Sequence, residues 1–135
     1  HRDLHSFPTR RSSDLANCLL LADKIEEGLN AIARVVAYYN ELQKQNKDDN
    51  PQNLWLRVET LRFIYSLDSK ELKASNENIQ RLLKNGARLE ELESAYQIET
   101  HIARGIARGH PEPEKLQRLI KIIYGKKPLE FLEKK

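Results

Sequence analysis

Four residues in the C-terminal third of the chain have side chains and spacing suited to binding a nucleic acid. They are Thr100, His101, Arg104 and Arg108. On a helix, positions three and four apart share one face, and arginine forms paired hydrogen bonds with phosphate or with the edge of guanine. We therefore expect this face to contact a duplex. In the alternative, the face is solvated and Arg104 and Arg108 pair with Glu99 and Glu112.

Lysines toward the C-terminus offer further positive charge, at Lys121, Lys126, Lys127, Lys134 and Lys135. An ammonium group contacts phosphate as a compact point charge. We expect Lys121, Lys126 and Lys127 to add phosphate contacts to the arginine face. In the alternative, these lysines only keep the end of the chain soluble.

Patterns that carry catalysis are missing from the sequence. A metal site needs ligands at characteristic spacing, but beyond residue 15 the chain has only His101, His110 and the distant Cys18. There is no phosphate-binding glycine loop and no nucleophile elbow. The acid-rich stretch from Glu90 to Glu93 is typical of an exposed helix face. We expect no enzymatic activity, no cofactor and no metal.

Residues 16–67 are predicted to form a long helical hairpin. Apolar residues from Leu21 to Leu42 recur every three or four positions, which is typical of one buried helix face. A polar turn closed by Pro51 ends this helix, and a second helix runs to about Leu67. Two long helices joined by a short loop pack antiparallel. We expect core packing for the aromatic residues Tyr38, Tyr39, Trp55, Phe63 and Tyr65. In the alternative, they form a recognition patch.

Residues 68–135 are predicted to form a bundle of shorter helices. Asp68 or Ser69 caps the first, which ends at Asn85-Gly86. Further helices are expected over 89–96, 99–108 and 114–124, with a tight turn near Ile98 and a last turn from Leu129. No stretch alternates with the period of a strand. The predicted fold class is all-α, a helical hairpin followed by short helices with helix-turn-helix character, with 16–135 as one domain.

From residue 79 to 132 the chain resembles the phage-repressor-like helix-turn-helix family. The resemblance lies in Gly86, Leu89 to Leu92, Tyr96, Ile98, Ala103, Ile106 and Gly109. It implies that the second and third helices read DNA and that Ala103 and Ile106 line the inner face of the third. Glu93 and Gln97 depart from the small residue and the turn glycine of that family, which puts the tight helix crossing in doubt.

An overlapping segment, from Glu90 to Lys121, resembles the RNA-binding helices of the signal-recognition-particle M domain. This resemblance implies RNA as the ligand in place of DNA. The methionines, the serine-arginine pair and the Gly-Ser-Gly motif of that family do not occur in this segment.

Residues 1–15 differ in origin from the rest of the chain. The stretch from His1 to Leu15 resembles, codon for codon, the translation of a common sequencing adapter. Sequence scars of this kind are excluded from fold reasoning. We expect the native part of the chain to begin at Ala16 and to be truncated at its N-terminal side, in keeping with a chain that contains no methionine.

Composition places the chain among globular proteins. It is 39% hydrophobic and 32% charged, with a net charge of only +3. The longest apolar run, Cys18 to Ala22, is far shorter than the roughly 20 residues of a membrane span. A single cysteine excludes an internal disulfide and favours a reducing compartment. We expect a cytoplasmic protein in which Cys18 is buried.

Together these patterns predict a nucleic-acid-binding regulatory protein that contacts DNA or RNA through its C-terminal bundle. The hairpin of residues 16–67 would serve self-association or bind a protein partner. The alternative is a helical protein-interaction or scaffold module, a fragment of a larger protein, with no nucleic-acid contact.

Overall fold

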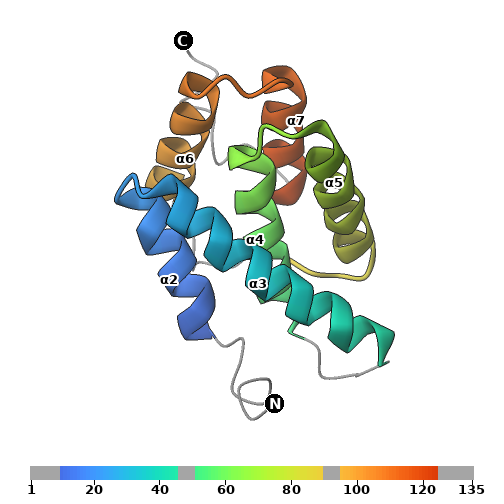
Figure 1. Ribbon diagram of the computed structural model, residues 1–135. Helices are drawn as coiled ribbons and strands as arrows, with labels where there is room; N and C mark the ends of the chain where they lie inside the picture. Colours follow the sequence, from blue (N-terminus) through green and yellow to red (C-terminus); the bar gives the residue numbers. More distant parts are fainter. Residues whose placement is uncertain (1–9, 46–50, 90–94, 125–135) are drawn as a thin grey trace.

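The structure, a computed structural model, describes residues 10–45, 51–89 and 95–124, and these form helices and no strand (Figure 1). The fold is all-α, as predicted. The helices are α2 (Arg10–Leu21), α3 (Ile25–Lys44), α4 (Gln52–Tyr65), α5 (Ser69–Lys84), α6 (Ala95–Ala107) and α7 (Pro113–Tyr124).

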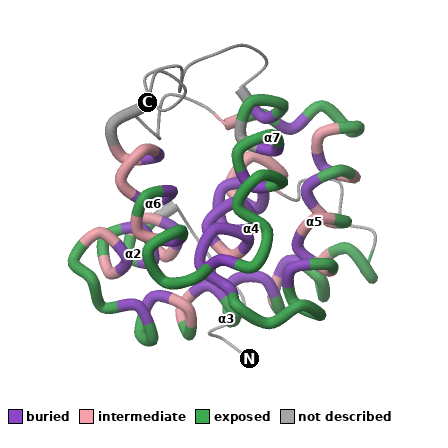
Figure 2. Tube along the Cα trace, turned by 90° about the horizontal axis from the view of Figure 1, so that it is seen from above, coloured by how far each residue is buried: buried purple, intermediate pink, exposed green. Residues whose placement is uncertain are grey.

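Helix α4 lies at the centre of the molecule. Every residue from Trp55 to Tyr65 is buried except Arg62, which is half-buried, and α2, α3, α5 and α6 all pack on this helix. Figure 2 shows most of α4 in the colour of buried residues. A helix covered on all sides needs apolar or fully bonded side chains around its circumference. The core is continuous and joins the 16–67 and 68–135 parts of the chain.

The start of the predicted hairpin is wrong. No single helix runs on from Leu21. Helix α2 ends at this residue, and the chain turns before α3 begins at Ile25. Asp23 has a left-handed backbone with φ of 68°, and the N–H groups of Asp23 and Lys24 donate to Leu20 and Leu19. These bonds satisfy carbonyls that a helix end leaves open. Helices α3 and α4 do pack on each other.

The boundaries of α5 and α7 follow the sequence signals. The carboxylate of Asp68 accepts a hydrogen bond from the Glu71 N–H at 3.0 Å, as an N-cap does. Gly86, which follows the C-cap residue Asn85 of α5, has φ of 95°, the conformation that favours glycine at a helix C-terminus. Helix α7 begins one residue before the predicted start and ends at Tyr124. The turn predicted from Leu129 lies outside the described residues.

The tight turn predicted near Ile98 does not form. Helix α6 is continuous from Ala95 to Ala107, so Gln97 and Ile98 lie within it; residues 90–94 are outside the described part. Ile98, His101, Ile102 and Gly105 form its buried face, whereas Ala103 and Ile106, expected on the inner face, are exposed. Gly105 decides this orientation, because a Cβ there would lie 2.5 Å from the carbonyl oxygen of Ile64.

The prediction that the aromatic residues pack in the core is confirmed for four of the five. The prediction that Cys18 is buried is wrong. Tyr39, Trp55, Phe63 and Tyr65 are at most 1% exposed, while Tyr38 is half-buried at the edge of the core. Cys18 is exposed. The buried face of α2 is formed by Ser13, Ala16, Asn17 and Leu20, and position 18 points away from that stripe.

Candidate functional site

His101 does not lie on an exposed face of α6. It is fully buried, so the expectation that it points at a duplex is wrong. It occupies the core stripe of α6 between Ile98 and Gly105, where the helix meets α2 and α4. In this position its side chain cannot reach a ligand in solution without unfolding.

The ring of His101 is held by one residue from each neighbouring helix. Nδ1 lies 2.7 Å from the hydroxyl of Tyr65 in α4, and Nε2 lies 2.7 Å from Oδ1 of Asn17 in α2. Asn17 donates through its amide nitrogen to Gln97, which fixes the oxygen toward the histidine. Both ring nitrogens are therefore satisfied when the imidazole is neutral, with Nε2 donating and Nδ1 accepting.

Burial opposes a charge at this position. It lowers the pKa of His101 to about 4, and the nearby guanidinium groups of Arg104 and Arg57 act in the same direction. Burial also raises the pKa of Tyr65 to about 12. The pair is thus a neutral hydrogen-bonded link between helices, not an acid and a base poised for proton transfer.

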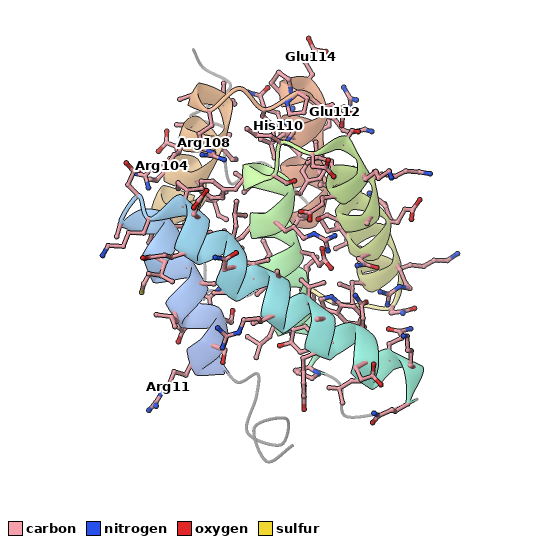
Figure 3. The ribbon with its side chains drawn as sticks, viewed as in Figure 1. Arg11, Arg104, Arg108, His110, Glu112 and Glu114 are labelled. Carbon is pink, nitrogen blue, oxygen red and sulfur yellow. The ribbon has the colours of Figure 1, made fainter. Side chains whose placement is uncertain are left out.

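Arg104 and Arg108 are bonded to the ends of other helices (Figure 3). Arg104 donates to the carbonyl oxygens of Leu20 and Leu21 at the end of α2. Its Nε lies 3.9 Å from Oδ1 of Asp23. Arg108 donates to the carbonyl of Tyr65 at the end of α4, at 3.5 Å. A cation stabilises the C-terminal carbonyls of a helix. The pairing expected with Glu99 and Glu112 is replaced by these bonds.

The residues of the predicted nucleic-acid contact differ in their exposure. Thr100 is half-buried and takes part in a polar interaction, and Lys121 is exposed on α7 and likewise engaged. Arg108 is exposed, whereas Arg104 is half-buried. Lys126 and Lys127 lie outside the described residues. Of the proposed face, only Arg108 and Lys121 therefore present charge to solvent within the described part of the chain.

A second buried polar cluster surrounds Glu59 on α4. Its carboxylate is completely buried and accepts from Trp55 Nε1 at 3.1 Å and from Asn78 Nδ2 at 2.7 Å. Arg62 pairs with it at 3.2 Å, and Ser75 donates to its backbone carbonyl. Burial raises the pKa of Glu59. All these donors lie on α4 and α5, so the cluster joins two helices that are adjacent in the sequence.

A groove lies along α3, where this helix meets α4 and α5. It has a volume of about 460 Å³ and runs along Leu29, Ile32, Ala33, Val36 and Ala37, with Arg62 of α4 and Glu71 of α5 on the opposite side. Ala33 and Ala37 are exposed, one helical turn apart. The sequence analysis missed this groove; the signal is the pair of alanines, Ala33 and Ala37, each directly after a bulky apolar residue, Ile32 and Val36.

No family model, no curated protein and no solved structure matches this chain. Within the described ranges no three His, Cys, Asp or Glu side chains converge as metal ligands do. None of the helices described is long and apolar enough to span a membrane.

Proposed function

We propose that this chain is a cytoplasmic helical protein-interaction module whose binding surface is the groove along α3. The observation that carries the proposal is the groove itself, about 460 Å³ in volume, with an apolar floor and two exposed alanines. The alternative face, on α6, has its histidine and Arg104 bonded into the fold. The α6 side chains that could contact a base, His101 and Arg104, are therefore already hydrogen-bonded to other helices.

The groove suits an amphipathic helix from a protein partner. Its α3 wall runs from Leu29 to Asn40, about three helical turns or roughly 17 Å at the rise of an α-helix. Small residues let two backbones approach closely, and Ala33 and Ala37 lie on one face. Asn30 and Asn40 at the edge of the groove offer hydrogen bonds to the polar rim of such a partner.

The charges across the groove set the orientation of the partner. Arg62 is already paired with the buried Glu59, whereas Glu71 is exposed. A partner helix with a lysine or arginine near Glu71 gains a favourable ion pair at the rim, which contributes more to specificity than to affinity.

Site-specific photocrosslinking tests this function. A benzoylphenylalanine at position 37 of the full chain should capture a discrete partner from a cell extract, and Ala33→Arg should abolish the adduct by filling the groove. The matched control carries the same group at Gln80, which is exposed on α5 and does not line the groove. Adducts of equal yield from positions 37 and 80 would refute the groove, and an adduct with a second copy would identify self-association.

A nucleic-acid-binding function is the second candidate, and the exposure of Arg108 and Lys121 supports it. Anisotropy titrations with duplex DNA and with structured RNA, at low and physiological salt, test it. Phosphate contacts give binding that weakens steeply with salt. An Arg108→Ala/Lys121→Ala variant should bind less tightly, while Lys73→Ala on the outer face of α5 should not. Absence of binding at low salt by the folded chain would exclude this candidate.

A further inference from the structure

Helix α3, which crosses the front of the molecule in Figure 1, carries a second stripe of side chains besides the one buried in the core. Its members alternate at spacings of four and three residues, the repeat that forms a helix–helix seam in a coiled coil. At 100° per residue they lie within about 80° of one another around the helix. All are exposed: Glu26, Asn30, Ala33, Ala37, Asn40 and Lys44. The four inner members line the α3 groove.

The order of side-chain types along this stripe is self-complementary. It runs charge, amide, alanine, alanine, amide, charge, with opposite charges at the two ends and its midpoint at the level of residue 35. A second copy of the chain, antiparallel and related by a two-fold axis at that level, places each residue opposite its counterpart. The facing pairs are Glu26 with Lys44, Asn30 with Asn40, and Ala33 with Ala37, and each pair occurs twice.

The charges at the ends of the stripe favour the antiparallel arrangement. Glu26 lies in the first turn of α3 and Lys44 in the last, and within the described ranges neither side chain forms an ion pair. A parallel copy in register would place like charges beside each other at both ends, where they repel. The antiparallel copy turns both contacts into ion pairs.

The middle of the stripe suits a close approach of two backbones. Ala33 and Ala37 are exposed one turn apart, and small side chains at the contact let two helix axes approach to about 8 Å. Asn30 and Asn40 flank the alanines, and each carboxamide offers both a donor and an acceptor to its counterpart. The alanines of a second copy then lie over the apolar floor of the groove.

We infer that the partner at the α3 groove is a second copy of this chain, packed with its own α3 antiparallel to the first. This choice of partner rests on the function proposed for the groove. The matched order of charges, amides and alanines selects it, because only a two-fold contact requires one helix face to be complementary to itself. From Glu26 to Lys44 the seam extends roughly 27 Å, a small interface that gives a reversible dimer.

Sedimentation velocity of the full chain tests the dimer. Between about 10 μM and about 1 mM the average mass should rise from monomer toward dimer, as a small interface requires. Ala33→Arg should keep the chain monomeric over this range, because a long side chain at the closest approach holds the helices apart. A parent chain that stays monomeric throughout, or an Ala33→Arg variant that dimerises equally well, would overturn the inference.

Charge reversal tests the antiparallel pairing. Glu26→Lys and Lys44→Glu should each raise the dimer dissociation constant about tenfold, because each places two pairs of like charges in the contact. The double variant Glu26→Lys/Lys44→Glu restores the ion pairs with exchanged signs and should dimerise within about threefold of the parent chain. Failure of the double variant to recover would refute this pairing.

Glu27→Lys is the matched control for charge reversal. Glu27 is exposed in the same first turn of α3, but it lies about 100° away from Glu26 around the helix and outside the stripe. The substitution changes the net charge and the helix terminus as Glu26→Lys does, and it should alter the dissociation constant less than about twofold. A tenfold effect here would mean that net charge, and not the facing pairs, controls the dimer.

Disulfide cross-linking separates a failure of this dimer from a failure of the groove. In a Cys18→Ser background, which removes the single thiol of the chain, a mixture of Asn30→Cys and Asn40→Cys chains should cross-link. Either chain alone should not, because its two thiols lie roughly 15 Å apart along the seam, too far for a disulfide. If the chain is monomeric while the crosslinker at position 37 captures a different protein, the second copy is excluded and the binding function of the groove stands. If neither contact forms, both are excluded.

Discussion

The two sides of α4 are stabilised by polar clusters of different construction. On the α5 side, Glu59 is bonded by groups from α4 and α5, and its partners Ser75 and Asn78 lie 16 and 19 positions away. On the α2 and α6 side, His101 joins Tyr65 and Asn17, which lie 36 and 84 positions from it. The first cluster closes a local helix pair, and the second joins distant parts of the chain.

This difference has consequences for stability. Closing a long loop costs more conformational entropy than closing a short one, so the α2 and α6 side depends on close backbone packing and on every member of its network. It also depends on α2, whose first turns supply partners to Arg57. We therefore expect the α2 and α6 side to be the more sensitive to substitution and to acid, and four predictions test this.

The largest effect is expected at the crossing of α6 and α4. In Gly105→Ala, the new Cβ would lie 2.5 Å from the carbonyl oxygen of Ile64 and 2.9 Å from its Cγ2, so the helices must separate. We expect a loss of about 3 kcal/mol in the free energy of unfolding, measured by urea titration of Trp55 fluorescence. Gly28→Ala is the matched control. Its Cβ would lie 2.6 Å and 2.7 Å from Cδ2 and Cγ of the buried Leu20, a side chain and not a backbone carbonyl, so a smaller loss is expected there and an equal loss would contradict the prediction.

The next effect is acid sensitivity due to His101. Its pKa in the folded chain, about 4, lies below the ordinary value of 6.5, so the unfolded chain takes up the proton first. The free energy of unfolding should fall as the pH drops from 6.5 to about 4, by about 3 kcal/mol in total, and be unaffected by this group at higher pH. The measurement is the pH dependence of unfolding relative to His101→Gln. Parallel curves for the two proteins would show that His101 is not responsible.

The Glu59 cluster should respond to pH with the opposite sign. Its pKa in the folded chain is raised above the ordinary 4.5, so the folded state holds the proton more tightly. The stability that Glu59 contributes should be largest below pH 4.5 and decline as the pH rises through the raised pKa. We expect Glu59→Gln to lose about 1 kcal/mol at about pH 5 and less at neutral pH. A loss that grows with rising pH would reverse the assignment.

The smallest effect is expected on the outer face of α5. Lys73 and Glu77 pair at 3.8 Å, with side chains 79% and 67% exposed. Exposed pairs of this spacing contribute only about 0.3 kcal/mol. Lys73→Ala should therefore leave the thermal midpoint almost unchanged, in contrast to the buried clusters. A loss above about 1 kcal/mol would mean that this face is covered in solution.

Local signals predicted the parts of the fold that depend on short stretches of chain. Asp68 as a cap, Gly86 as a terminator and the end of α7 at Tyr124 follow from the chemistry of a few neighbouring residues. The prediction failed for α6, where the Ala103 and Ile106 stripe was taken as the inner face. Successive residues are rotated by about 100° around a helix, so a small error in the assigned face moved His101 from solvent into the core.

The candidate site was harder to predict than the fold. Nothing in the sequence near Arg104 indicates that its partners are the carbonyls of Leu20 and Leu21, because those groups lie 84 and 83 positions away. The α3 groove likewise forms only where α3, α4 and α5 meet. Both features depend on which helices become neighbours.

The sequence by itself determined an all-α chain, the caps of α5 and most of the aromatic residues of the core, since periodicity, capping and hydrophobicity act locally. Only the tertiary structure decided that α4 is central, that His101 is buried and that Arg57 faces α2. The physical reason is that burial and charge compensation are properties of contacts between distant segments. Gly105 is an example of this difference. The sequence shows that it has no side chain, and only the structure shows that a side chain there would collide with the backbone of Ile64.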